Sequence, residues 1–285
     1  MNGRRESECG TGIEVLSVIR LNRYYEGKTK ALVLSYDDGR IYDRRMVETL
    51  DKYGIKATFH LNAGNLGMEG HLRPEEVNGL YRNHEIAAHT YSHPHMLQIT
   101  EEQRLMELWR DRERLEEISG NIVDGFSYPY GEYDEKLKQI TEAFGFSYAR
   151  SIESQYDFQL PKDFYAWHPT CHHRENCVEL AKKYLDYDYR EGLSVFLLWG
   201  HGHNFEREGN WDILDQFCKL MGNRDDIWYC TMGEFARYVR GLGALKTSVR
   251  GTLMYNPTDQ RLWLERNGKL VSIGPGERKR TEELL

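Results

Sequence analysis

The feature that most constrains the fold of this chain is a regular alternation of short apolar segments with longer amphipathic ones. Residues 31–36 are typical of a buried strand, and residues 43–53 place apolar side chains on one helical face before Gly54, which can end a helix. Further strands are expected at residues 55–61, 85–88, 126–128, 146–149, 195–198 and 227–230, and further helices at 100–119, 134–144, 176–185, 213–221 and 231–240. Strands that alternate with helices form parallel sheets, so we predict the α/β class.

The segment 100–119 carries the clearest helix signal. Thr100 and Gln103 have the spacing of a capping box, and Thr231 with Glu234 repeats this pattern further along the chain. Apolar residues recur along the helix at helical spacing, and we expect them to pack against the sheet: Leu105, Leu108, Trp109, Leu115 and Ile118.

The length and composition favour one large domain with a small addition. A chain of 285 residues with 40% hydrophobic content can bury one large core, which we assign to residues 31–243. Residues 244–285 change to short alternating segments with turn signals at Asn256-Pro257 and Asn267-Gly268, so we expect a small β-hairpin appendage. Residues 1–30 are treated as an N-terminal extension.

The charge pattern and the cysteines limit the partners and the compartment. The net charge is −7 and both signs are interspersed, so neither a nucleic-acid footprint nor a membrane anchor is expected. No apolar run approaches the roughly 20 residues of a membrane span, and the first ten residues are charged where a secretory signal is apolar. Five cysteines without a C-x-x-C pair fit a reducing compartment, so the expected localisation is cytoplasmic. The oligomeric state is left open.

Two short motifs predict a metal centre. Asp37 and Asp38 directly follow the first strand, and His89 and His93 follow the short strand 85–88. Because loops after parallel strands gather at one edge of the sheet, these side chains are expected to meet there. One carboxylate and two imidazoles leave positions open for water on a divalent ion, and the spare carboxylate can accept the proton that this water loses. This set is typical of a hydrolase.

Other histidine and cysteine clusters are less specific. The segment Cys171-His172-His173 with Cys177 lacks the paired spacing of a structural zinc site, and a substrate-facing loop is the favoured interpretation. His60, His84 and His95 are expected to be structural or surface residues.

The ordered motifs resemble those of the polysaccharide deacetylases, the family-four carbohydrate esterases. The matching segments run from about Leu32 to Tyr238 and include, in order, Ser35-Tyr36-Asp37-Asp38-Gly39, His89-Thr90-Tyr91-Ser92-His93, Ser127-Tyr128-Pro129-Tyr130-Gly131, Trp167 and Leu198-Trp199-Gly200-His201. The first two motifs are specific and the later ones loose. The resemblance implies a distorted (β/α)7-type barrel that uses a zinc-like ion to remove acetyl groups from sugars.

The resemblance also assigns roles to individual residues. It implies that Asp38, His89 and His93 hold the metal, that Asp37 is the general base and that His201 is the general acid. The backbone amide of Tyr130 is expected to stabilise the oxyanion, Trp167 to wall the pocket for the acetyl methyl, and Trp199 to contact the substrate. Zinc is the expected ion, and cobalt or nickel also suit these ligands.

Two positions depart from the family pattern. The third motif usually begins with an arginine that orients the base, and this chain has Ser127 there, so either another cation takes that role or the base is freer. The fourth motif usually has an aspartate before Trp167, where this chain has Ala166, and Asp163 is a possible partial replacement. Asp163 or Glu206 could also support His201, and His203 is the alternative acid.

The sequence therefore predicts a metal-dependent hydrolase that removes acetyl groups from an N- or O-acetylated saccharide. One alternative keeps the site and hydrolyses a C–N amide bond in a non-sugar compound. The other, favoured by the substitutions at Ser127 and Ala166, is a catalytically silent, metal-containing carbohydrate-binding protein. The particular saccharide and the choice between N-acetyl and O-acetyl groups are not defined by the sequence.

Overall fold

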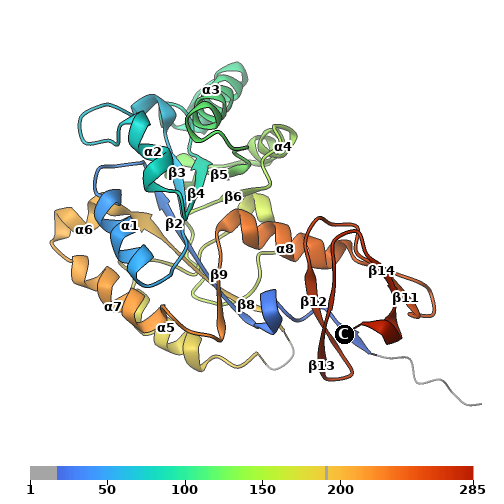
Figure 1. Cartoon of the computed structure of the whole chain (residues 1–285). Helices are drawn as coiled ribbons and strands as arrows, with labels where there is room; N and C mark the ends of the chain where they lie inside the picture. The colour runs from blue at the N-terminus through green and yellow to red at the C-terminus, as the bar shows by residue number, and fades with distance from the viewer. Residues whose placement is uncertain (1–17, 190–191, 285) are drawn as a thin grey trace, which may run out of the picture.

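The main body is a curled α/β half-barrel built on one eight-stranded parallel sheet (Figure 1). The computed structural model describes residues 18–189 and 192–284. Its strands are β2 (Lys30–Asp37), β3 (Thr58–Leu61), β4 (Glu85–Ala88), β5 (Gly125–Ser127), β6 (Tyr148–Arg150), β7 (Cys171–His172), β8 (Ser194–His201) and β9 (Ile227–Tyr229). The order is β6-β5-β4-β3-β2-β8-β7, and β9 pairs with β2. The predicted α/β barrel-type fold is confirmed.

The central strand β2 explains how the sheet curls. Strand β8 pairs with it along its whole length, from Lys30 to Asp37. On the other side, β3 pairs with the last three residues of β2 and β9 with the first three. All three pairings are parallel, so the residues that end β2, β3 and β8 lie together at one edge.

Helices follow most of the strands. They are α1 (Asp43–Lys52), α2 (Pro74–Leu80), α3 (Glu101–Ser119), α4 (Glu135–Ala143), α5 (Cys177–Asp186), α6 (Gly202–Glu208), α7 (Trp211–Met221) and α8 (Met232–Ala244). Both predicted capping boxes are present, at the starts of α3 and α8. The sequence analysis missed the short elements α2, α6 and β7. None of the helices in the described part of the chain has the length and apolar character needed to span a bilayer.

The expected apolar face of α3 was wrong for two residues. Leu108 and Leu115 are buried, but Leu105 is 40% and Trp109 56% exposed. The buried face instead runs through Leu108, Asp111, Leu115 and Ser119, at spacings of three and four. A buried carboxylate therefore occupies a core position, which an analysis of apolar residues alone cannot find.

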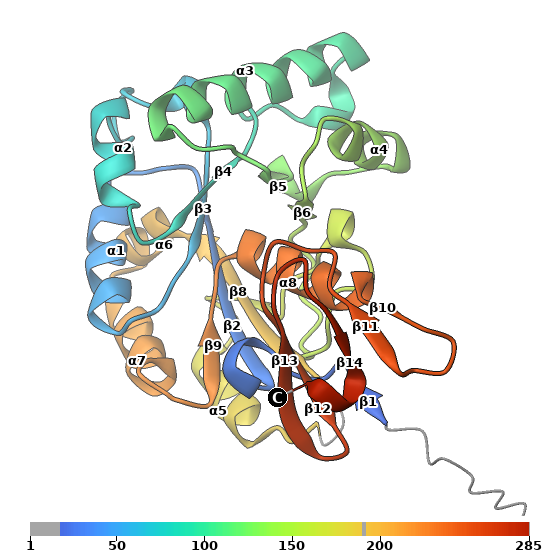
Figure 2. The same cartoon turned by 45° about the vertical axis from the view of Figure 1, so that its right-hand side comes forward.

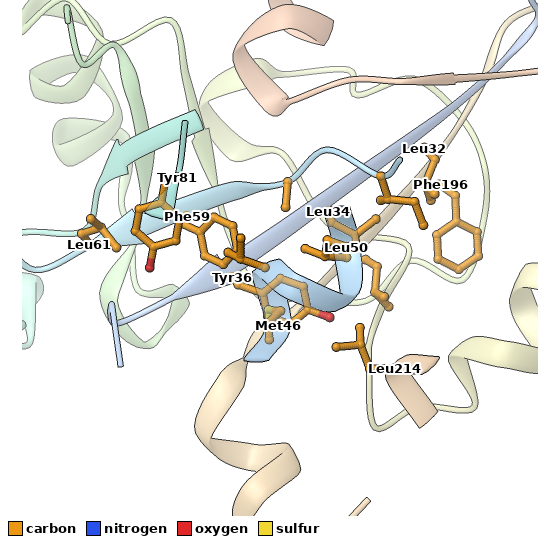
Figure 3. Close-up of a cluster of buried hydrophobic side chains, with 14 of the residues drawn as sticks. Leu32, Leu34, Tyr36, Met46, Leu50, Phe59, Leu61, Tyr81, Phe196 and Leu214 are labelled. Atoms are coloured by element: carbon orange, nitrogen blue, oxygen red, sulfur yellow. The ribbon is translucent and has the colours of Figure 1, made fainter. Parts of the chain in front are cut away.

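Successive side chains of the central strand β2 point to opposite faces of the sheet. They therefore belong to two separate clusters of buried hydrophobic residues. On β2, Leu32, Leu34 and Tyr36 face the side covered by α1, α5 and α7, and Figure 3 shows them packed with Met46, Leu50 and Phe196. The intervening residues Ala31 and Val33 face α8 in the second cluster. Strand β2 is therefore buried on both faces, as is typical of parallel sheets.

The C-terminal segment is a β appendage that packs on α8 (Figures 1 and 2). Its strands are β10 (Lys246–Thr247), β11 (Leu253–Tyr255), β12 (Leu262–Arg266), β13 (Lys269–Ile273) and β14 (Arg278–Arg280), joined by β1 (Ile19–Arg20), which pairs with β12. Leu262, Leu264 and Ile273 are buried in the same cluster as Phe235 of α8 and Val33 of β2. The appendage thus shares a core with the main body, whereas the proposed boundary at residue 244 stays a prediction.

Because of this shared core, truncating the appendage should destabilise the whole chain. We expect Leu264→Ala to lower the free energy of unfolding by about 2–5 kcal/mol, the range for emptying a buried leucine site. Urea unfolding followed by tryptophan fluorescence measures this, and Leu270→Ala is the control because Leu270 is 45% exposed. A separate early transition that leaves the main transition in place would contradict a shared core.

Candidate functional site

Polar side chains from several strands meet at the carboxyl edge of the sheet. Asp37 ends β2, and its strand partners are His60 of β3 and His201 of β8. His89 follows β4, and Ser127 ends β5. The structure therefore brings both predicted catalytic residues, Asp37 and His201, to one edge with the predicted metal ligands.

Asp38, His89 and His93 form a group that fits a divalent metal ion. Their donor atoms all lie within 4.8 Å of one another, and no other group of three such side chains gathers in this way within residues 18–189 and 192–284. The Asp38 Oδ1 atom is 4.0 Å from His89 Nε2 and 3.9 Å from His93 Nε2. Carboxylate oxygen and imidazole nitrogen are ligands that zinc accepts. The cluster Cys171 to Cys177 does not form a comparable group.

The tautomer of His89 supports this assignment. Its Nδ1 atom lies 2.8 Å from the carbonyl oxygen of Ser127, which can only accept, and 2.7 Å from Ser127 Oγ, which can also accept. Donation from Nδ1 to this residue leaves Nε2 free as a ligand. Burial lowers the pKa of His89 to about 4, which keeps the ring neutral. For Asp38, burial and the neighbouring Asp37 raise the pKa, and a bound cation would relieve both effects.

Left-handed backbone conformations concentrate at this site. The φ angles of Asp38, Thr90, His93 and Tyr130 are 85°, 66°, 59° and 59°. Such conformations cost of order 1–3 kcal/mol per non-glycine residue and persist where the surrounding structure enforces them. The strained backbone at Asp38, His93 and Tyr130 therefore lowers the stability of the fold, and it holds two candidate metal ligands and the turn of the third motif in place.

Asp111 of α3 is a site-supporting residue that the sequence analysis missed. Its buried carboxylate accepts hydrogen bonds from the backbone amides of Ala63, at 2.7 Å, and His89, at 2.8 Å. It thereby joins the segments that follow β3 and β4 and fixes the backbone of His89. The signal in the sequence was a charged residue on the inward face of an amphipathic helix.

Asp37 is held by an arginine that the sequence analysis did not identify. Arg150, at the end of β6, is 0% exposed and forms an ion pair with the Asp37 carboxylate. Its Nε atom donates to Ser35 Oγ at 2.8 Å, and Nη1 donates to the carbonyl oxygen of Ser151 at 2.8 Å. Although burial opposes ionisation, Arg150 and the nearby histidines hold the pKa of Asp37 well below its ordinary value.

Arg150 resolves the question raised by Ser127. Ser127 Oγ lies 3.3 Å from Asp37 Oδ1 and makes no ion pair, as expected of a serine. The positive charge comes from Arg150 on the neighbouring strand β6 instead. Strands β5 and β6 pair so that Arg150 lies opposite Ser127. His60 is fully buried, with Nδ1 3.2 Å from Ser35 Oγ and 3.5 Å from Asp37 Oδ1, so this expected structural histidine also borders the site.

His201 and His203 occupy different positions. Burial lowers the pKa of His201 to about 3, so its ring is neutral in the free protein. His203 Nδ1 lies 3.8 Å from Asp38 Oδ2, next to the metal-ligand group. Neither carboxylate suggested as a support for His201 is available: Asp163 pairs with Lys138 at 2.6 Å, and Glu206 accepts a hydrogen bond from Trp211 Nε1 at 2.9 Å.

The three aromatic candidates differ in their environment. Tyr130 is 48% exposed, stacks on His95 with ring centroids 3.9 Å apart and contacts His93 at 4.6 Å. Trp199 is mostly buried, and its ring lies 4.6 Å from the Arg150 guanidinium.

Trp167 faces the second core instead. Its ring contacts Tyr148, Phe164 and Phe235 there, and only 2% of the residue is exposed. The predicted role of Trp167 as a pocket wall stays a prediction.

Comparisons with known proteins extend this description. Residues 25–149 match the family model for polysaccharide deacetylase. The chain is 31% identical over 114 residues to chitin deacetylase 1 of Cryptococcus neoformans var. grubii, which covers 39% of this chain and 23% of that protein. It is 30% identical over 115 residues to the peptidoglycan-N-acetylglucosamine deacetylase of Bacillus cereus, covering 39% and 40%. The chain thus spans less than half the length of these curated relatives.

Solved structures share the fold at low sequence identity. A polysaccharide deacetylase candidate from Mycobacterium smegmatis has a TM-score of 0.58 at 20% identity, covering 78% of this chain and 93% of that one. The Puue allantoinase has a TM-score of 0.59 at 14% identity, covering 75% and 91%. These similarities support the fold alone. The resemblance to the polysaccharide deacetylases that the motifs indicate is confirmed by the family match over residues 25–149.

Proposed function

We propose that this protein is a metal-dependent hydrolase that removes acetyl groups from an N- or O-acetylated saccharide. The observation that carries the proposal is the group Asp38, His89 and His93 directly beside a buried, ion-paired carboxylate, Asp37. The names of two relatives, a chitin deacetylase and a peptidoglycan-N-acetylglucosamine deacetylase, support the substrate class.

In this proposal Asp38, His89 and His93 hold the ion, with zinc the first candidate and cobalt or nickel also suitable. Such an ion, when bound, acidifies water and polarises a carbonyl oxygen. Asp37 accepts the proton that the attacking water loses. The Arg150 ion pair keeps Asp37 charged and fixes its direction, so the carboxylate is in its ionised form at the start of every cycle, although the same ion pair lowers its basicity.

His201 delivers a proton to the leaving nitrogen or oxygen. Because burial keeps its ring neutral in the resting protein, it has to gain this proton during the reaction. The proton taken up by Asp37 is the available source, since both residues end neighbouring strands in register. The backbone amide of Tyr130, a residue in a left-handed turn, is the candidate donor to the oxyanion.

The non-sugar amide alternative shares this site and differs only in substrate. Acetate release from acetylated chitooligosaccharides and xylooligosaccharides, compared with ring opening of cyclic amides, discriminates between the two. Acetate release supports the deacetylase, and hydrolysis confined to the cyclic amides overturns it.

Removing the metal should abolish the activity. We expect dialysis against a chelator to stop acetate release from an aryl acetate or a chitooligosaccharide, and added zinc, cobalt or nickel to restore it. His93→Ala should weaken zinc binding by at least about 10- to 100-fold. Loss of a residue that only hydrogen-bonds to a metal ligand already has an effect of this size, and loss of a ligand itself should have at least as large an effect. His71→Ala is the control, since His71 lies outside the ligand group. Full activity in protein shown to be metal-free would contradict the proposal.

Asp37→Asn should separate catalysis from metal binding. We expect kcat to fall by about 10²- to 10⁴-fold, the usual contribution of a general base, while zinc content measured by atomic absorption stays unchanged. An Asp37→Asn protein that retains normal turnover would contradict the assigned base.

The Arg150 ion pair can be tested by moving the cation. We expect Arg150→Ser to destabilise the fold by about 3–5 kcal/mol, because it leaves the Asp37 charge buried without a partner, and to lower kcat far more than it raises KM. Adding Ser127→Arg to Arg150→Ser should recover part of kcat, because Ser127 Oγ already lies beside Asp37. Arg114→Ser, at a solvent-exposed ion pair, is the control for loss of charge. Equal kcat in the native protein and Arg150→Ser would refute this role.

A further inference from the structure

A cavity lies at the junction of the main body and the appendage. Its volume is about 570 Å³, within the range used by small-molecule sites. The walls come from the 3₁₀ turn Tyr25–Gly27, from β9, from α8 and from the segment that precedes β12. In Figures 1 and 2, α8 separates the sheet from β12 and β13, which places these elements around one junction.

This cavity is remote from the metal-ligand group. Strand β9 pairs with Lys30–Leu32 at the start of β2, whereas Asp37 and Asp38 lie at its other end. Seven steps of about 3.3 Å separate Lys30 from Asp37, which is roughly 23 Å along the strand. The two sites can therefore be tested independently.

The appendage completes the cavity through a close contact with α8. Gln260 Nε2 donates a hydrogen bond of 2.8 Å to the carbonyl oxygen of Arg237. A Cβ atom on Gly241 would lie only 2.8 Å from the same Gln260 Nε2, so the glycine permits the approach. Tyr238 strengthens the junction, because its hydroxyl accepts from the Trp263 amide at 2.9 Å. The contact sets Arg261, the next residue after Gln260, against the same cavity as Arg237.

The cavity carries an excess of positive charge. Two of its lysines have acidic partners: Lys56 pairs with Glu234 at 2.6 Å and Lys28 with Glu26 at 3.3 Å. Arg237 makes no side-chain hydrogen bond or ion pair with a residue that the structure describes. Arg261 donates a hydrogen bond of 3.1 Å to the neutral Ser272 Oγ, and its charge acts, after that of Lys279, to lower the pKa of Glu277 without forming an ion pair with it. Two arginines without a bonded carboxylate facing one cavity, in a chain of net charge −7, favour an anion between them.

Aromatic side chains form another wall of this cavity. Tyr25 is half-exposed, and Trp228 is half-buried with its ring fixed against Tyr24 and Tyr238 at 5.4 and 5.1 Å. Rings of this kind offer a flat apolar surface to a sugar, and the neighbouring amide and guanidinium groups can bond its hydroxyls.

We infer that this cavity binds an acidic saccharide, a sugar bearing a carboxylate or phosphate, with Arg237 and Arg261 on the anion and Tyr25 and Trp228 on the ring. The choice of a saccharide rests on the proposed function, whereas the anion site does not. The appendage would thereby hold an acidic part of the substrate, or of the polymer that contains it, away from the reacting acetyl group.

Calorimetric titration of the full chain tests this inference with four probes: trigalacturonic acid, glucose 6-phosphate, neutral cellotriose and inorganic phosphate. We expect at least one acidic sugar to bind ten times or more tightly than cellotriose, and the tighter of the two identifies carboxylate or phosphate as the anion. Arg237→Gln with Arg261→Gln should weaken this binding at least tenfold. The double control Arg110→Gln with Arg114→Gln, which removes two charges from the solvent face of α3, should leave it unchanged.

Three results would overturn the inference: neither acidic sugar binds more tightly than cellotriose, the double variant binds as well as the native protein, or, where glucose 6-phosphate is the tighter of the two acidic sugars, inorganic phosphate binds as tightly as it does. Tyr25→Ala provides a second check, because it should weaken binding of the sugar and leave inorganic phosphate unaffected. Aryl-acetate hydrolysis should be unchanged in Arg237→Gln/Arg261→Gln. Because the titration needs no turnover, failure of the acidic-sugar site and failure of the deacetylase proposal are distinguishable.

Discussion

The buried ion pair between Arg150 and Asp37 is the constraint on which the geometry of the site depends. Both side chains are almost completely withdrawn from water, and taking each charge out of water costs several kcal/mol. Two further guanidinium donors offset part of this cost through hydrogen bonds to Ser35 Oγ and the Ser151 carbonyl. These contacts join the ends of β2 and β6, which are separated by three other strands in the sheet order. The direction of the Asp37 carboxylate is therefore fixed from several sides.

The metal-ligand group is held by a different device, the backbone. Asp38 and His93 adopt left-handed conformations, and the amide of His89 is bonded to Asp111. A carboxylate on a helix that binds backbone amides positions a ligand without competing for the ion. Ligand placement and base placement thus rest on separate supports, so damage to one need not remove the other.

The sequence predicted the parts of the site that depend on the order of strands along the chain. It missed the residues that reach the site only through contacts between segments distant in sequence. Asp37, Asp38, His89 and His93 could be grouped because they follow strands of a parallel sheet, and such strand ends share an edge, whereas His201 was assigned through the family resemblance. Arg150 is 113 residues from Asp37, and only the pairing of β5 with β6 shows that it replaces the cation absent at Ser127. Asp111 was missed for a related reason. The apolar pattern of α3 predicted a buried face that includes Trp109, but the observed buried face includes Asp111, whose carboxylate accepts hydrogen bonds from backbone amides.

The position of Arg150 also bears on the interpretation of the chain as a silent carbohydrate-binding protein. That interpretation drew its support from the loss of the usual arginine and aspartate at Ser127 and Ala166. A protein that had lost catalysis would gain nothing from keeping two opposite charges buried, since apolar residues of similar volume are often as stabilising as a buried pair. Here the cation is present, each of its three nitrogens has a hydrogen-bond partner, and one of these partners is the Asp37 carboxylate. The substitution at Ser127 is therefore better explained as a relocation of the arginine to the adjacent strand than as a loss of its role, which favours the hydrolase.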